Sequence, residues 1–250
     1  MTFEKVVLII PTYNEAAVIE DTLSAIAEIR TSITDFDIHV LVFDSASTDA
    51  TQTIVAGLQV NYAWLHMQTE PQKSGLGSAY RQAMEYALTA LLADMVIEFD
   101  ADLSHQPKYL IPMLEKIKTH DVVLGSRYVQ DGQIPSDWGW QRKFISVFGN
   151  QIARIILTSR YKDFTSGFRI TRRNVLQQVL SEQFISSQYA YKLQLLWLLH
   201  KSQAKIYEYP IVFIDREKGQ SKLPANSIVD SLRVLILLRF YEIKRFFNLT

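Results

Sequence analysis

The stretch Met95-Val96-Ile97-Glu98-Phe99-Asp100-Ala101-Asp102-Leu103-Ser104-His105 decides the fold, because an apolar run of strand length ends in two carboxylates. Side chains two residues apart on a strand share a face, so we expect Asp100 and Asp102 to converge at its carboxyl end. Two carboxylates held close repel each other unless a cation lies between them, and their oxygens suit Mg2+ or Mn2+. The pattern predicts a divalent metal held by Asp100 and Asp102, although the same spacing also occurs in ordinary turns and solvated strand ends.

Apolar segments of strand length alternate with helical patterns through the first half of the chain. The expected strands cover residues 6–10, 38–43, 62–67, 95–100 and 122–124. The expected helices cover residues 19–29, 52–58 and 107–118, and a further one follows the segment 73–79 and reaches about residue 92. This alternation predicts an α/β fold, with a Rossmann-like, mostly parallel sheet flanked by helices. Polar clusters follow the strands, and sheets of this class bind ligands beyond the carboxyl ends of their strands.

The second half begins with a long polar loop, residues 128–140, which suggests a functional role by its length. Helical patterns follow over 142–158, 174–180 and 191–201, and a late strand is expected within 205–214. Residues 227–250 form a last amphipathic segment that carries both basic and aromatic side chains. A helix lying on a membrane surface has this composition, and so does a helix packed on its own domain or across a dimer.

Composition excludes several classes of protein. The formal net charge is zero, so no overall field attracts nucleic acid, and we expect no nucleic-acid partner. The chain has no cysteine, which excludes disulfides, thiolate zinc sites and cysteine nucleophiles. The first residues run straight into a strand rather than a signal peptide, and no apolar stretch is long enough to span a bilayer. We therefore expect a cytoplasmic protein.

A set of motifs in order resembles the family 2 glycosyltransferases, and most of all the dolichyl-phosphate (polyprenyl-phosphate) mannose synthases. The motifs are Pro11-Thr-Tyr-Asn-Glu15, the segment 44–51, Lys73-x-Gly-Leu-Gly-x-Ala79, Asp100-Ala-Asp-Leu-Ser-His105, Gly125-Ser-Arg-Tyr128, Ser166-Gly-Phe-Arg169 and Arg216-x-x-Gly-x-Ser-Lys222. The resemblance covers roughly residues 5–222. It implies a GT-A fold, a nucleotide-sugar donor, a divalent metal and inversion at the sugar carbon.

Two positions depart from the family pattern. Ser45 stands where the family usually carries a second aspartate, which weakens or retunes the expected contacts to the nucleotide. Ala50 stands where the family usually carries glycine, a change that the turn accepts only if φ is negative there.

The resemblance assigns the donor site to two sets of residues. The residues expected to bind the nucleotide sugar are Pro11, Tyr13, Glu15, Asp44, Lys73, Gly75, Asp100, Arg216 and Lys222. Asp102 is expected to act in catalysis through the metal, which would neutralise the diphosphate leaving group. Each motif also has a plain structural interpretation, such as a strand-to-helix turn at 11–15 or a charged surface loop at 216–222.

Arg127, Arg142 and Ser146 are expected, by the same resemblance, to hold the phosphate of a lipid acceptor. Guanidinium groups donate in a fixed fork that matches phosphate oxygens, and Arg142 and Ser146 lie four residues apart on one helix face. A phosphate nucleophile is already anionic at neutral pH, so it needs no strong general base. An acceptor hydroxyl would need one, and Asp163 would then be the residue to test.

The resulting prediction is an inverting transfer of mannose from GDP-mannose to a polyprenyl phosphate, at the cytoplasmic face of a membrane. We expect residues 1–224 to form the catalytic domain and 225–250 a C-terminal amphipathic helix, with a homo-oligomer as an open possibility. UDP-glucose or another nucleotide sugar is the alternative donor, because a few pocket contacts decide that choice. A third alternative, favoured by Ser45 alone, is a nucleotide-sugar-binding subunit without turnover.

Overall fold

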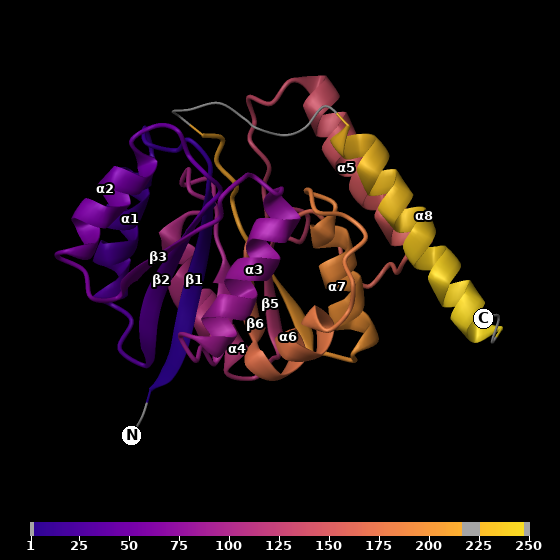
Figure 1. Ribbon diagram of the computed structural model, residues 1–250. Coiled ribbons are helices and arrows are strands. Elements are labelled where there is room, and N and C mark those ends of the chain that lie inside the picture. The colour runs from indigo at the N-terminus through magenta and orange to yellow at the C-terminus, as the bar shows by residue number, and fades with distance from the viewer. Residues whose placement is uncertain (1–2, 217–225, 248–250) are drawn as a thin grey trace.

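A computed structural model describes residues 3–216 and 226–247 of the chain. Lys222, predicted to bind the donor, lies outside the described residues, and so does the predicted domain boundary at 224/225. The elements alternate between strand and helix through most of the chain, as the sequence pattern predicts, and Figure 1 shows helices on both faces of one central sheet.

Seven strands form the sheet, in the order β3-β2-β1-β4-β6-β5-β7. Their bounds are β1 (Glu4–Thr12), β2 (Phe36–Asp44), β3 (Leu65–Thr69), β4 (Met95–Glu98), β5 (Val122–Ser126), β6 (Arg169–Arg172) and β7 (Ile206–Pro210). The strand pairs β1–β2, β1–β4, β2–β3 and β5–β7 are parallel, whereas β6 runs antiparallel to both β4 and β5. The prediction of a mostly parallel sheet is therefore confirmed.

Nine helical elements surround the sheet in the described part of the chain. They are α1 (Ile19–Arg30), α2 (Thr51–Gln59), α3 (Leu76–Thr89), the 3-10 turn η1 (Pro107–Tyr109), α4 (Leu110–Ile117), α5 (Trp140–Ile156), α6 (Arg173–Leu180), α7 (Tyr191–Lys201) and α8 (Ser227–Phe246). Alternating residues of β1 point to opposite faces, so Leu8 packs with α1 and α4, while Val7 and Ile9 pack with α3, α6 and α7. Both faces are covered, which explains the continuous apolar runs at residues 6–10 of β1 and 95–97 of β4.

Strand β6 is an element that the sequence pattern does not predict. It has only four residues, two of them arginine, and it follows a segment that looks like a functional loop. Because β6 runs antiparallel, its first residue lies beside the carboxyl ends of β4 and β5. The segment 163–168 therefore arrives at the same edge of the sheet as the polar clusters that follow β1, β2, β4 and β5.

Helices α5, α7 and α8 form a third layer beyond β5. Val234, Leu235 and Leu238 of α8 are buried against α5 and α7, in a cluster that also includes Leu124 of β5. Figure 1 shows α5 and α8 side by side along one edge of the molecule. One side of α8 thus packs on its own domain, one of the three alternatives for this segment.

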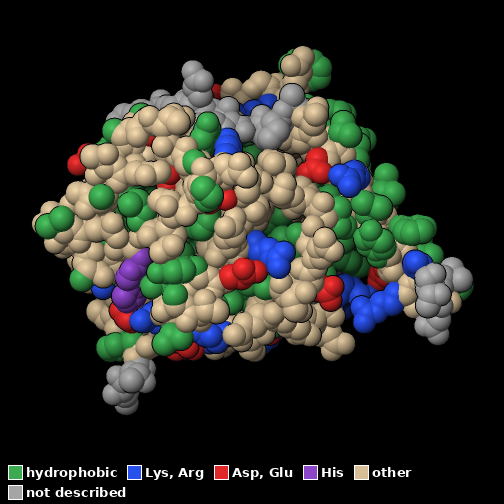
Figure 2. All heavy atoms as spheres, viewed as in Figure 1, with side chains coloured by type: hydrophobic (Ala, Val, Ile, Leu, Met, Phe, Trp, Pro, Cys, Tyr) green, Lys and Arg blue, Asp and Glu red, His purple; other side chains and the backbone are tan. Residues whose placement is uncertain are grey.

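The other sides of α5 and α8 leave many apolar side chains exposed. On α5 they are Trp140, Phe144, Ile145, Val147, Phe148 and Ile155, and on α8 they are Ile228, Val229, Leu232, Ile236, Phe240, Tyr241, Ile243 and Phe246. We call this set the α5–α8 apolar surface, and Figure 2 shows hydrophobic side chains gathered over α8. Across residues 3–216 and 226–247, no helix has the length and apolar character needed to cross a membrane.

Candidate active site

A cleft lies at the carboxyl edge of the sheet, over β1, β2 and β4. Among the predicted donor and metal residues, those that line it are Pro11, Tyr13, Glu15, Lys73, Gly75, Asp100, Asp102 and Arg216. Ser45, Gln188 and Tyr189 line it as well, although only Ser45 had been singled out from the sequence. The structure therefore brings together motifs that are as much as 200 residues apart in the chain, at the edge where sheets of this class bind ligands.

Asp100 and Asp102 face this cleft from a turn rather than from a strand. Strand β4 ends at Glu98, and Leu103 has a positive φ of 59°, so the chain turns sharply through the aspartates. The prediction that the two residues share a strand face is wrong, and the turn alternative is correct for the backbone. Both carboxylates nevertheless line one cleft, because the turn directs them to the same side.

Asp102 is held by two partners. Its Oδ1 accepts a hydrogen bond from the backbone N–H of Ser104, and its Oδ2 lies 2.7 Å from Nη2 of Arg216. The Asp102 side chain is only 7% exposed, so its charge needs a nearby cation. Arg216 supplies that cation in this conformation and lies across the cleft, whose enclosed volume is about 130 Å3.

Asp100 is oriented by His105, which is buried beneath it. The Nδ1 of His105 accepts the Asp100 backbone N–H at 3.1 Å, so the ring hydrogen is placed on Nε2, which lies 3.4 Å from Asp100 Oδ2. Burial lowers the pKa of His105 and favours the neutral ring. Burial would raise the pKa of Asp100, but His105 and then the charges of Lys192, Arg216 and Arg127 hold it below its ordinary value. Asp100 therefore stays ionised at neutral pH.

The donor set at this turn suits a hard divalent cation. Asp100 and Asp102 offer carboxylate oxygens alone, and no group of three or more His, Asp or Glu side chains that could hold a metal occurs in the described ranges. A metal held by two carboxylates would keep several positions for water and phosphate oxygens, as Mg2+ usually does. The position of the Arg216 guanidinium on Asp102 shows that this carboxylate already attracts a cation.

Asp44 organises the loop after β2 instead of lining the cleft. Its carboxylate is fully buried and accepts hydrogen bonds from Thr12 Oγ1, from the N–H and hydroxyl of Ser47, and from Gln52 Nε2. In this conformation no Asp44 oxygen is exposed, so the next residue, Ser45, is the one that meets the cleft. At Ala50 φ is −75°, which is why the turn accepts alanine where the family usually carries glycine.

Tyr13 and Lys73 form one wall of the cleft together. The Lys73 ammonium lies 3.7 Å from the centre of the Tyr13 ring, a cation–π contact that joins the loop after β1 to the loop before α3. The nearby Gly75 has φ of 107°, and a Cβ there would lie 2.4 Å from Gln188 Nε2. Gly75 is therefore required for its left-handed backbone and for the close approach of the segment around Gln188.

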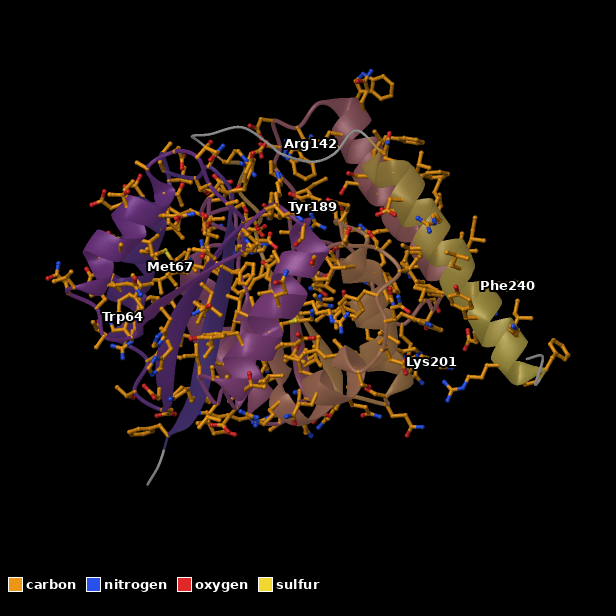
Figure 3. All side chains as sticks on the ribbon, viewed as in Figure 1. Trp64, Met67, Arg142, Tyr189, Lys201 and Phe240 are labelled. Atoms are coloured by element: carbon orange, nitrogen blue, oxygen red, sulfur yellow. The ribbon has the colours of Figure 1, made fainter. Side chains whose placement is uncertain are left out.

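Tyr189 closes the cleft from the opposite side and carries no sequence motif that would identify it. Figure 3 shows Tyr189 beside α3 and Arg142 near the start of α5. Burial, and then the negative charge of Asp100, raise the pKa of Tyr189 to about 12. Its hydroxyl therefore remains protonated at neutral pH and can donate a hydrogen bond to an anionic ligand.

Arg127 lies at the end of β5 in a buried ion pair. Its Nε and Nη2 both reach the Asp163 carboxylate at 2.7 Å, and Nη2 also donates to Thr165 Oγ1. Arg127 is 9% exposed and Asp163 is fully buried. Burial would raise the pKa of Asp163, but the charge of Arg127 holds it below the ordinary value, so Asp163 is a poor base. A general-base role for Asp163 does not fit this geometry.

Ser146 belongs to the network around Arg127. Its hydroxyl lies 2.7 Å from the Tyr128 hydroxyl, and its backbone oxygen accepts a hydrogen bond from Asn150 Nδ2. That Asn150 amide also reaches Thr165 Oγ1, the atom to which Arg127 donates. The loop after β5, the segment before β6 and the helix α5 are thus joined by one set of hydrogen bonds.

Arg142 takes part in a more exposed ion pair on the first turns of α5. Its guanidinium binds both oxygens of Asp215 and stacks on the Trp138 ring at 3.9 Å, while Trp138 Nε1 donates to the same carboxylate. Arg142 is 51% exposed and Asp215 is 31% exposed. Asp215 precedes Arg216 in the chain, so adjacent residues contact the predicted acceptor arginine and the predicted metal aspartate.

The Ser166–Arg169 motif has a framework role at its last residue. Arg169 of β6 lies opposite Glu98 of β4 and binds its carboxylate through Nε and Nη2, with both side chains 1% exposed. The Tyr191 hydroxyl donates to the same carboxylate at 2.7 Å. Arg169 therefore does not line the cleft, and it fixes β6 to β4 next to the predicted metal aspartates.

Comparison with known proteins begins with the family model for Glycosyl transferase family 2, which matches residues 7–180. An undecaprenyl-phosphate mannosyltransferase of Micrococcus luteus is 33% identical over 228 residues, covering 91% of each chain. A polyprenol monophosphomannose synthase of Mycolicibacterium smegmatis is 30% identical over 231 residues, covering 92% of this chain and 84% of the relative.

Solved structures share the fold at low sequence identity. Mannosyl-3-phosphoglycerate synthase from Rubrobacter xylanophilus gives a TM-score of 0.69 at 18% identity, covering 97% of this chain and 75% of the other. The mannosyltransferase PcManGT from Pyrobaculum calidifontis, solved with GDP-Man and Mn2+, gives 0.58 at 18% identity, covering 98% and 65%. These neighbours establish the GT-A fold, and the matches in sequence establish the rest: the chain is a glycosyltransferase and belongs to glycosyl transferase family 2.

Proposed function

We propose that this glycosyltransferase moves mannose from GDP-mannose to a polyprenyl phosphate, with inversion at the anomeric carbon and with Mg2+ or Mn2+ bound at Asp100 and Asp102. The names of the two sequence relatives support the sugar and the lipid phosphate, and their match covers more than nine tenths of this chain. The supporting structural observation is that one helix, α5, carries both Arg142, whose partner Asp215 precedes the cleft residue Arg216, and a row of exposed apolar side chains.

That combination suits an acceptor with an anionic head and an apolar tail. A guanidinium matches phosphate oxygens with two parallel hydrogen bonds. Phe144, Ile145 and Phe148 follow Arg142 along α5 and are at least half exposed. The buried ion pair of Asp163 supports the same acceptor class, because a hydroxyl acceptor needs a general base and the Asp163 carboxylate is already engaged by Arg127.

The proposed reaction is a single displacement. An oxygen of the lipid phosphate forms a bond to the anomeric carbon while the bond from that carbon to the diphosphate breaks. The electron pair leaves with the nucleoside diphosphate, the monoester becomes a diester, and no proton has to be moved. The metal, when bound, neutralises charge on the leaving diphosphate.

This chain's own residues orient the two substrates. Tyr13, Glu15 and Lys73 line the cleft and would contact the nucleotide, and Asp102 and Arg216 line it as well and would face the diphosphate. Tyr189, which stays protonated, offers a hydroxyl to the same region. These groups are preorganised by the fold, so they stabilise developing negative charge without reorganising during the reaction.

Transfer of radiolabelled mannose tests the proposal directly. Purified protein is incubated with labelled GDP-mannose, a short polyprenyl phosphate and Mn2+, and label in the organic phase is counted against a reaction with chelator. We expect label in the lipid only when metal is present. Parallel reactions with labelled UDP-glucose test the alternative donor. Preferential transfer of glucose would overturn the choice of mannose but would leave the proposed acceptor class unchanged.

We also propose that the α5–α8 apolar surface rests on the membrane that holds the lipid acceptor. Arg233, Arg239, Lys244 and Arg245 lie on α8 among its exposed apolar residues, a composition that favours an anionic bilayer surface. The double variant Ile236→Asp/Phe240→Asp should reduce binding to phosphatidylglycerol vesicles about tenfold or more at an unchanged melting temperature. Val60→Asp, at an 85% exposed position of α2's C-terminal end, is the control. Equal vesicle binding by all three proteins would overturn the proposal.

A further inference from the structure

Lys192 is a buried lysine that none of the roles above uses. It is the second residue of α7 and is 6% exposed. In the described part of the chain the structure records no hydrogen bond or ion pair for its Nζ, whose recorded neighbour is the Tyr189 ring at 5.6 Å. Burying a lysine charge without a nearby anion costs free energy of folding, so we looked for an anion that Lys192 could bind.

Gly167 makes the room that Lys192 occupies. A Cβ at Gly167 would lie 2.2 Å from Lys192 Nζ, closer than real Cβ atoms approach another heavy atom, and 3.0 Å from its Cε. The same Cβ would lie 3.4 Å from His105 Cε1. A side chain at position 167 would therefore have to displace the end of Lys192, whose ammonium lies against the backbone at this point.

This position lies between the two halves of the site. The residue after Gly167 is Phe168, whose carbonyl oxygen accepts a hydrogen bond from the backbone N–H of Gly125. This bond ties the segment to β5, which ends next to Arg127. On the other side, the Glu98–Arg169 pair ties the segment to β4 and Asp100.

The charge balance distinguishes Lys192 from the arginines around it. Arg127 is matched by Asp163, Arg142 by Asp215 and Arg216 by Asp102, each at hydrogen-bond distance. Of these four cations, Lys192 is the one for which the described residues show no such carboxylate partner. An ammonium is a compact point charge with three donors, so it can hold one phosphate oxygen and leave another free to react.

We propose that Lys192 binds the phosphate of the acceptor, between the donor cleft and Arg127, and so presents its nucleophilic oxygen to the sugar. This assignment rests on the proposed function. Lys192 gives up no proton and forms no covalent bond in the reaction. Arg127 then acts mainly by shaping the site through Asp163 and Thr165, while Lys192 carries the unmatched positive charge that the phosphate neutralises.

Binding of farnesyl phosphate, a short prenyl monophosphate, tests the assignment without turnover. Calorimetry compares the wild type with Lys192→Met, which keeps most of the side-chain volume and removes the charge, and with Lys192→Arg, which keeps the charge. Lys201→Met is the control, because Lys201 is on the same helix but exposed and paired with Glu242. We expect Lys192→Met to weaken binding of farnesyl phosphate roughly tenfold to a hundredfold, Lys192→Arg to recover part of the loss, and Lys201→Met to match the wild type.

Binding of GDP-mannose with Mn2+ separates the proposal from a general structural role. Lys192→Met should keep its donor affinity within about twofold and its melting temperature, and in steady state should raise the acceptor KM more than it lowers kcat. Equal binding of farnesyl phosphate by the wild type and Lys192→Met would overturn the role of Lys192 alone. Loss of donor binding with acceptor binding retained would move Lys192 to the donor site and overturn it as well. A wild type that does not bind farnesyl phosphate would instead overturn the proposed acceptor.

Discussion

The proposed acceptor side and the proposed donor side hold their charges in different ways. On the proposed acceptor side, Arg127 and Asp163 form a bidentate pair that is almost completely buried. On the proposed donor side, Arg216 Nη2 lies 2.7 Å from Asp102 Oδ2, and Arg216 is 25% exposed. A buried, doubly bonded pair is part of the framework, whereas a partly solvated pair can exchange one partner for a ligand. We therefore propose that the acceptor side is built in advance and that metal and diphosphate complete the donor side.

The largest effect is expected at Asp102. Asp102→Asn should reduce transfer on the order of a thousandfold, because the amide removes the charge that would hold the metal against the diphosphate. GDP-mannose binding by the variant should also lose its dependence on Mn2+, as measured by calorimetry. Asp35→Asn, which changes an exposed carboxylate paired with Lys118, serves as the control. Metal-dependent transfer at the wild-type rate would contradict the metal site.

Asp163 is expected to matter most for stability. Asp163→Asn leaves the Arg127 charge buried without its partner and should cost about 3–5 kcal/mol in the free energy of unfolding at pH 7. The folded-state pKa of Asp163 lies below its ordinary value of 3.8, so its stabilisation is present above 3.8 and is lost as the pH falls through the folded value. Urea denaturation should therefore show a constant gap between the two proteins from pH 7 to about 4, and a narrower gap below. A gap that stays constant below pH 3 would show that Asp163 ionisation is not its source.

Arg142, also on the proposed acceptor side, is expected to affect acceptor binding more than stability. Its pair with Asp215 is about half exposed, so Arg142→Ala should change the free energy of unfolding by less than about 1 kcal/mol. The acceptor KM should rise about tenfold, because the guanidinium contact to phosphate is lost. Arg154→Ala, further along α5, is the control for general changes to the helix. A large loss of stability with an unchanged acceptor KM would place Arg142 in the framework with Arg127.

The smallest effect is expected at Arg216, and it tests whether a metal can replace this arginine at Asp102. Arg216→Ala removes the cation that lies on Asp102, so Mn2+ alone should bind a fewfold more tightly in the absence of nucleotide. GDP-mannose should bind more weakly to the same variant, since one cation facing the diphosphate is lost. Opposite changes in these two affinities, both read by calorimetry, would support exchange at Asp102. Weaker binding of Mn2+ would contradict it.

Much of the parallel part of the fold could be predicted from the sequence, because β1 and β2 are apolar at successive positions and their neighbours have clear helical periodicity. The same pattern located the site, since polar residues follow strands that end at one edge. Strand β6 could not be predicted in this way. It has four residues with two arginines, and the burial of Arg169 depends on Glu98, which is 71 positions away in the chain. Long-range charge pairing leaves no periodic signal in a single sequence.

The site residues that could be predicted from the sequence are those that belong to recognisable motifs. Tyr13, Asp100, Asp102 and Arg216 belong to recognisable motifs, and the structure places all four around one cleft. Tyr189 and Lys192 belong to none. Tyr189 lines the cleft because the segment before α7 passes close to Gly75, and Lys192 of α7, which we propose as an acceptor residue, lies against Gly167. Asp44 shows the reverse case, because a motif residue expected at the donor is used to hold its own loop.

The Glu98–Arg169 pair also has a consequence for how the centre of the sheet assembles. Strand β6 is short, and apart from Arg169 its buried side chains are Ile170 and Thr171, which alone would permit several alignments against β4. A slip of one residue would turn the guanidinium to the opposite face, into the apolar layer that holds Phe168 and Ile170, and would leave Glu98 without a partner. Either outcome buries an isolated charge, which costs several kcal/mol, roughly the stability of a small domain. One ion pair thus favours a single register of β6 against β4, and with it the alignment of the strand ends that carry the cleft.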